Sequence, residues 1–153
     1  MKIRLAETKD IKQILPLFIE LDVKHSNNNT DLRTVIPKER YRNIFQDVFK
    51  SNSNLILIVV EIEEKIVAFA LGKIIKIQNN LLLKDQIVGE ILYFAVDVNF
   101  QRKGIARVLM HDIEERLKSR GADKLELRIF SFNNEPIPEK INYKPKYTVY
   151  EKH

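Results

Sequence analysis

The amino-acid sequence predicts a single domain of the α+β class. Its 153 residues are enough for one hydrophobic core and too few for two ordinary domains. No repeat, low-complexity tract or linker divides the chain. Segments with helical spacing of apolar residues are interspersed with segments that alternate or run continuously apolar, as strands do. We therefore expect one domain over residues 1–153, with a sheet flanked by helices.

The first part of the chain predicts one strand followed by two helices. Residues 2–6 alternate between polar and apolar, which is typical of a short strand. A helix is expected next, with Thr8 as its N-cap and a kink or break at Pro16, because proline has no N–H to donate. The second helix is expected to begin at Pro37 and to run to Phe49, since proline suits a first helical position.

The centre of the chain predicts three strands. Leu55–Glu61 and Lys65–Gln78 are separated by a short charged turn and indicate a hairpin, in which Gly72 indicates a bulge or bend. A third strand is expected over Gln86–Val98. Three consecutive leucines, residues 81–83, precede it. We expect them to pack into the core; the alternative is that they are exposed and pair two copies of the chain as a homodimer.

The last part predicts one more helix and two strands. The helix is expected to begin near Gly104 and to end at Gly121, a residue that readily takes the left-handed conformation after a helix. A strand over Lys124–Phe132 follows, then an irregular segment over residues 133–138. Lys146–Glu151 is predicted to form a final strand.

Composition excludes several classes of protein. Without cysteine there can be no disulfide, thiolate zinc site, cysteine nucleophile or cysteine-bound iron–sulfur cluster. The three histidines have no metal-site spacing, so we expect no metal. No segment approaches the roughly 20 apolar residues of a membrane span. The N-terminus also lacks the apolar centre of a signal peptide, so we expect a cytoplasmic protein without a membrane partner.

A basic turn, residues 101–103, connects the third central strand to the helix at Gly104. The first N–H groups of a helix lack internal partners and carry partial positive charge, so they bind phosphates. Glycine lets a phosphate approach the backbone, while Arg102, Lys103 and Arg107 add cationic donors. The formal net charge of +5 is consistent with a polyanionic ligand, or simply with solvated lysines. The turn matches neither the P-loop nor the three-glycine dinucleotide pattern, so its chemistry indicates a phosphorylated ligand of unspecified kind.

Gln101-Arg102-Lys103-Gly104-Ile105-Ala106 resembles the Gln/Arg-x-x-Gly-x-Gly/Ala motif of GNAT N-acetyltransferases, which bind acetyl-coenzyme A. The order of predicted elements around it is also similar to that family over nearly the whole chain, weakening after Phe132. The resemblance implies the GNAT fold, a mixed and mostly antiparallel sheet flanked by helices. Its order would be strand, two helices, three strands, helix, strand, a short or lost helix, and a last strand.

The resemblance also implies which residues bind the coenzyme, and it implies no metal. The pantetheine arm would lie where the strands matching residues 90–96 and 125–131 splay apart. Its implied contacts are Phe94, Ala95, Val96 and Val98, with Asn133 as a further one unless that residue serves only as a turn or cap. The implied pyrophosphate contacts are Gln101, Arg102, Lys103, Gly104, Ile105, Ala106 and Arg107.

Glu90 is the candidate general base. Its position six residues before Val96 is similar to that of the strand glutamate that activates the amine through water in histone acetyltransferases. Regular alternation would place Glu90, Leu92, Phe94 and Val96 on one face if no bulge intervenes, and would point Tyr93 away from Glu90. The alternative is a solvated carboxylate at a strand end.

The usual general acid of the family is missing, because Pro138 occupies the position of its tyrosine. Tyr143 is the nominated substitute, with Tyr147, Tyr150 and water as further donors. Packing of these rings in the last strands is the alternative. The resemblance thus implies transfer of an acetyl group to a primary amine of a small molecule or peptide. A GNAT-fold acyl-CoA sensor without turnover is the alternative, and nucleic-acid binding is not expected because no aromatics interleave with a basic patch.

Overall fold

The computed structural model describes residues 1–129 and 140–152. These residues form one five-stranded sheet of order β1-β2-β3-β4-β5, antiparallel except for the parallel pair β4–β5. The elements are β1 (Lys2–Leu5), η1 (Thr8–Asp10), α1 (Ile11–Asn28), α2 (Lys38–Phe49), β2 (Leu55–Ile62), β3 (Lys65–Ile77), β4 (Gln86–Val96), η2 (Val98–Phe100), α3 (Ile105–Ser119) and β5 (Lys124–Leu127). The predicted mixed, mostly antiparallel sheet flanked by helices is confirmed.

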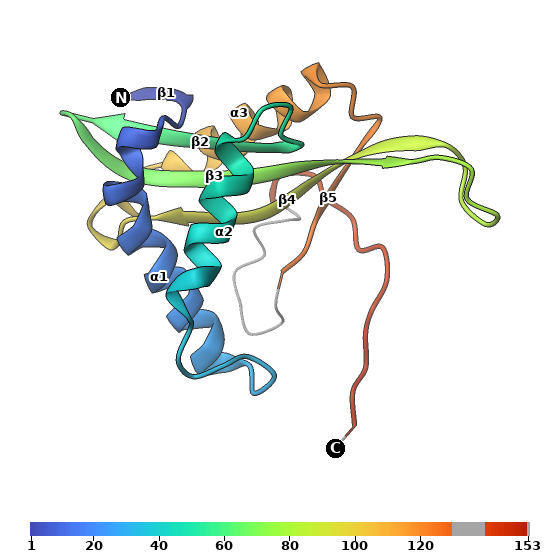
Figure 1. Cartoon of the computed structure of the whole chain (residues 1–153), viewed down its shortest axis with the longest axis horizontal. Coiled ribbons are helices and arrows are strands. Elements are labelled where there is room, and N and C mark those ends of the chain that lie inside the picture. The colour runs from blue at the N-terminus through green and yellow to red at the C-terminus, as the bar shows by residue number, and fades with distance from the viewer. Residues whose placement is uncertain (130–139, 153) are drawn as a thin grey trace.

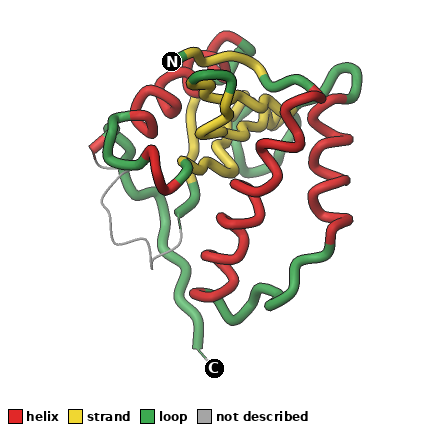
Figure 2. Tube along the Cα trace, turned by 90° about the vertical axis from the view of Figure 1, so that its left-hand side faces the viewer, coloured by secondary structure: helices red, strands yellow, loops and turns green. Residues whose placement is uncertain are grey.

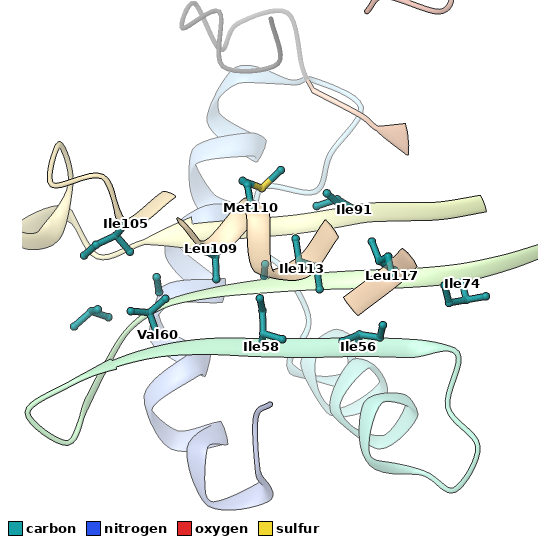
Figure 3. Close-up of a cluster of buried hydrophobic side chains, with 13 residues drawn as sticks. Ile56, Ile58, Val60, Ile74, Ile91, Ile105, Leu109, Met110, Ile113 and Leu117 are labelled. Carbon is teal, nitrogen blue, oxygen red and sulfur yellow. The ribbon is translucent and has the colours of Figure 1, made fainter. Parts of the chain in front are cut away.

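Helices cover both faces of the sheet. α1 and α2 lie side by side on one face, and α3 lies on the other (Figures 1 and 2). Strand β2 is buried on both sides: Ile56 and Ile58 face α3, whereas Leu57 and Val59 face α1 and α2. Figure 3 shows the α3 side of this core. Burial on both faces explains why this strand is a continuous apolar run in the sequence.

The start of α1 differs from the prediction. Thr8 belongs to η1, and α1 begins only at Ile11. The N-cap of η1 is Glu7 instead of Thr8, and the backbone N–H of Glu7 donates to the Asp10 carboxylate. Pro16 lies inside α1 without dividing it, so the predicted break is wrong. The buried side chains Ile14 and Phe18 hold the helix against the sheet on either side of the proline, and this packing offsets one missing hydrogen bond.

Two predictions about exposed segments are also wrong. Leu81 and Leu82, expected in the core, are 107% and 90% exposed at the tip of the β3–β4 hairpin. Their turn is held by Asn80, whose side-chain oxygen accepts the N–H groups of Leu82 and Leu83. The homodimer through these leucines stays a prediction. Residues 146–151 form no strand, and β5 ends at Leu127.

An ion-pair network ties β1 to the start of α1. The Arg4 guanidinium donates to Asp10 Oδ2 at 2.6 Å and to Glu61 Oε2 at 2.6 Å. Asp10 is 3% exposed. Hydrogen bonding from Arg4, opposed by burial, holds the pKa of the Asp10 carboxyl below its usual value. The network therefore stabilises the fold only while Asp10 is ionised.

Asp10→Asn is expected to lower the free energy of unfolding by about 3 kcal/mol at neutral pH, because it leaves a largely buried guanidinium underpaired. Since the folded-state pKa of Asp10 is depressed, its contribution is complete above the unfolded-state pKa of about 3.9 and is lost as the pH falls below it. Urea denaturation from pH 7 to pH 3 should therefore show the gap between wild type and variant closing. Asp47→Asn, at an exposed carboxylate, is the control and should produce no such gap.

Candidate functional site

The two parallel strands β4 and β5 separate at the site. They pair only from Val88 opposite Lys124 to Ile91 opposite Leu127. β4 then continues to Val96, still paired with β3 on its other side. Among the residues that the structure describes, no strand covers the second edge of β4 after Ile91. Its backbone there can therefore hydrogen-bond an extended ligand.

The N-terminus of α3 lies next to this open edge. Gly104 is its N-cap, has φ of +79° and offers no side chain to the first turn. The first helical bond runs from Val108 N–H to Gly104 C=O, so the three preceding N–H groups lie ahead of the helical ladder. A Cβ on Gly104 would meet nothing within 4 Å. Glycine is thus needed for the left-handed backbone, and the space beside it is open.

A cavity of about 540 Å³ joins these two features. It extends from the end of β4, past the basic turn, to the first turn of α3. The cavity brings together nine of the residues predicted to bind the coenzyme: Phe94, Ala95, Val96, Gln101, Arg102, Gly104, Ile105, Ala106 and Arg107.

Three other predicted coenzyme contacts do not line this cavity. Val98 lies in η2 with 62% of its surface exposed. The ammonium of Lys103 lies 5.1 Å from the centre of the Phe100 ring, which itself lines the cavity. Asn133 lies outside the described residues.

One wall of the cavity was missed by the sequence prediction. It is formed by α1, with further contacts from the segment after the undescribed residues 130–139. The residues concerned are Leu17, Glu20, Leu21, Lys24, Lys140 and Ile141. The three- and four-residue spacing on α1 marks one helix face, but nothing in the sequence shows that this face meets the end of β4.

A β-bulge changes the direction of Glu90. Leu71 pairs with Tyr93 but Gly72 pairs with Ile91, so Leu92 is an extra residue in β4. Phe94 packs on the α3 side of the sheet, whereas Tyr93 packs on the side of α1 and α2. Because of the bulge, Glu90 shares the face of Tyr93 and Ala95. The regular alternation that would place Glu90 on the face of Phe94 and Val96, and away from Tyr93, is therefore interrupted.

Glu90 is a buried carboxylate with one cationic partner. It is 8% exposed, and its Oε1 forms an ion pair with Arg128 Nε at 3.1 Å. It does not line the cavity. Its register neighbours are Lys73 on β3 and Glu126 on β5. The carboxylate lies immediately before the point where β4 and β5 separate, on the face covered by α1 and α2.

An aromatic and ionic cluster holds α1 and α2 against β4 beside the bulge. The ring of Phe18 lies 5.1 Å from that of Tyr93, and the Arg40 guanidinium lies 5.2 Å from the Tyr93 ring. Arg40 Nε donates to the buried carboxylate of Asp22 at 2.7 Å. This cluster fixes the helices relative to the strand that carries the open edge.

Tyr143 contacts α3 rather than the cavity. Its hydroxyl donates to Glu114 Oε1 at 2.9 Å, and its ring packs against the core beneath α3. Burial, together with the hydrogen bond to Glu114, raises the pKa of the Tyr143 phenol. A phenol with a raised pKa donates its proton less readily. This environment favours the structural alternative for Tyr143 over the role of general acid.

Tyr143→Phe is expected to lower the free energy of unfolding by about 1 kcal/mol, the loss of one half-buried hydrogen bond, and to leave kcat unchanged. Tyr150→Phe, at a 90% exposed ring, is the matched control and should alter neither quantity. Urea denaturation and steady-state kinetics measure the two effects. A 100-fold loss of kcat with stability retained would instead make Tyr143 the acid.

A bare helix N-terminus beside a separating strand pair, with helices on both faces of a mixed sheet, defines the coenzyme A-dependent N-acyltransferase class of fold. The sequence model of the acetyltransferase (GNAT) family matches residues 22–137. This chain belongs to the GNAT acetyltransferase family. No curated protein matches its sequence significantly.

Solved structures share this fold at low sequence identity. A mutant of the BH1408 protein from Bacillus halodurans has a TM-score of 0.90 at 20% identity, over 100% of this chain and 99% of its own. Glucosamine-6-phosphate N-acetyltransferase from Arabidopsis thaliana has a TM-score of 0.71 at 23% identity, covering 99% and 97%. AAC(6')-Iy, bound to a bisubstrate analogue, has a TM-score of 0.75 at 12% identity, covering 99% and 97%.

Two further features of the described residues bear on partners. Their helices include none that is both long enough and apolar enough to cross a membrane. Within residues 1–129 and 140–152, no group of three or more histidine, aspartate or glutamate side chains is arranged to hold a metal ion.

Proposed function

We propose that this chain transfers the acetyl group of acetyl-CoA to a primary amine of a small molecule or peptide. The observation that carries the proposal is the single cavity that joins the open edge of β4 to the bare N-terminus of α3. Family membership supports acetyl transfer, and the acceptors of the two named acetyltransferases, an amino-sugar phosphate and an aminoglycoside, are amines.

The described residues fit the coenzyme at both ends of the cavity. The N–H groups of Ile105, Ala106 and Arg107 precede the helical ladder and suit a pyrophosphate, and the open space at Gly104 leaves them accessible. The Arg102 side chain adds a cationic donor at the cavity wall. The backbone of Phe94–Val96 offers hydrogen bonds to the amide-bearing pantetheine arm. Acetyl-CoA would supply the activated thioester.

Each residue then has a defined task in the transfer. Glu90 accepts a proton from the acceptor ammonium through water, which frees the nitrogen lone pair. The nitrogen attacks the thioester carbonyl carbon, and a backbone N–H near Val96 stabilises the developing oxyanion. As the C–N bond forms and the C–S bond breaks, the nitrogen loses its second proton, which water relays to the departing thiolate, since the Tyr143 hydroxyl is committed to Glu114. The products are an N-acetylated amine and free coenzyme A.

A second candidate function is an acyl-CoA sensor without turnover. Two observations favour it: Glu90 is paired with Arg128 outside the cavity, and the Tyr143 hydroxyl is committed to Glu114. In this case the cavity would still bind the coenzyme, but no acceptor would lose a proton to Glu90.

Two measurements on one preparation distinguish these functions. Coenzyme A at 100 times its Kd is expected to stabilise the protein by about 2.7 kcal/mol, visible as a raised Tm. Acetyl-CoA with a panel of amines is expected to release free thiol. Stabilisation without thiol release for any amine would favour the sensor. No stabilisation and no calorimetric binding would contradict both functions.

A further inference from the structure

Arg128 presents unused hydrogen-bond donors beside the candidate base. Its Nε forms an ion pair with Glu90 Oε1 at 3.1 Å, while 74% of its side chain is exposed. Neither Nη1 nor Nη2 has a partner among residues 1–129 and 140–152. An ion pair with so exposed a cation adds little stability. The Nη1 and Nη2 groups of this exposed guanidinium therefore retain N–H donors that a carboxylate or phosphate can accept.

The surrounding charges favour an anion at this position. Lys73, Glu90 and Glu126 lie next to one another across β3, β4 and β5, and side chains in register project to the same face. Glu126 already accepts two cations, Lys124 at 3.1 Å and Lys146 at 2.6 Å. Together with Lys73 and the Arg128 guanidinium, these make four cationic groups beside the two carboxylates. The surplus positive charge attracts an anion and disfavours an acceptor that carries only positive charge.

We propose that the acceptor amine also carries a carboxylate or phosphate, which Arg128 binds through Nη1 and Nη2 while Nε remains on Glu90. This inference rests on the proposed function, in which Glu90 receives the proton of the ammonium. Because one guanidinium bridges the base and the anion, the amine and the anionic group must lie within a few bonds of each other. Amino acids and amino phosphates satisfy this condition, whereas polyamines and isolated lysine side chains do not.

Arg128 is thus a specificity-determining residue, distinct from the coenzyme cavity. This role differs from that of a merely structural counter-ion of Glu90, because loss of such a counter-ion would affect all acceptors equally. A role in anion binding affects KM only for acceptors that carry the anion.

Matched acceptor pairs test the inference: glycine against glycinamide for a carboxylate, and O-phosphoethanolamine against ethanolamine for a phosphate. The anionic member is expected to have a kcat/KM about 10- to 100-fold higher, as a charge-assisted hydrogen-bonded pair gives. Arg128→Gln should abolish this preference by raising KM for the anionic member, and Arg128→Lys should restore part of it. Lys9→Gln makes the same charge change beyond β1, at the opposite edge of the sheet, and should leave the preference intact.

Calorimetry with the coenzyme A complex separates failure of the inference from failure of the proposed function. If thiol is released but neutral acceptors are used equally well, the inference is wrong and the proposed function stands. If no amine releases thiol, binding still decides the inference. Tighter binding of the anionic members that is lost in Arg128→Gln supports it, while equal or undetectable binding overturns it.

Discussion

Glu90→Gln is expected to lower kcat by about 10²- to 10⁴-fold while leaving the Kd for coenzyme A unchanged. The amide retains the size of the carboxylate but cannot take a proton from the acceptor ammonium. Glu90 does not line the cavity that would hold the coenzyme, so binding of the coenzyme should not change. Steady-state kinetics over a range of pH measure kcat, and calorimetry with coenzyme A measures the Kd. The kcat of the variant should also depend less on pH than that of the wild type.

Glu126→Gln is the control for that experiment. Glu126 lies opposite Glu90 in the β4–β5 register and undergoes the same loss of charge. Its carboxylate is occupied by Lys124 and Lys146, so kcat should stay within about threefold of wild type. Equal kcat for Glu90→Gln and wild type would mean that Glu90 is only a paired carboxylate at the strand end.

Gly89→Ala is expected to lower the free energy of unfolding by about 1–3 kcal/mol or more, the cost of overpacking a core. A methyl group there would lie 2.9 Å from Leu117 Cβ and 3.1 Å from Ala122 Cβ, which are fixed to the backbone around the end of α3. The helix must therefore move away from β4. Because the first turn of α3 is the proposed pyrophosphate site, affinity for coenzyme A should fall as well.

Gly72→Ala is the matched control for the packing effect. Its methyl group would lie 3.2 Å from Ile113 Cδ1 and 3.2 Å from Leu117 Cδ2, which are mobile ends of side chains. We expect a smaller loss, partly offset by the lower entropy of the unfolded chain. Urea denaturation compares the two variants. Equal losses would show that contacts with backbone-fixed atoms do not determine how well the α3–sheet interface tolerates an added methyl group.

The bare helix N-terminus at Gly104, which is the proposed phosphate site, was predictable because it depends only on residues close to it in the sequence. A strand, a basic turn and a glycine at a helix start lie within about twenty consecutive residues, and each needs only its neighbours. Gly121 ends α3 with φ of +96°, as predicted, for the same reason. Gly72 shows the limit: it indicated a strand irregularity, yet it also provides room for α3, as Gly89 does.

The surroundings of Glu90 could not be predicted, because one inserted residue reverses the face of everything beyond it. Gly72 indicated an irregularity in this pair of strands, but nothing in the sequence around Leu92 indicates that the extra residue lies in β4. The partner Arg128 comes from a different strand end, 38 positions later in the chain. The prediction that the three leucines pack into the core failed for a similar reason, since apolar character alone does not show how far a hairpin extends beyond its neighbours.

Periodicity, turn residues and the motif around Gly104 were sufficient to predict the class of fold, the order of β1 to β5 along the chain and the helix start at Gly104, because these depend on interactions over a few residues. Tertiary structure alone decided that α1 forms a wall of the cavity, that Glu90 faces α1 and α2, and that Arg128 pairs with it. These features depend on strand register and helix packing between distant segments, which no local pattern encodes.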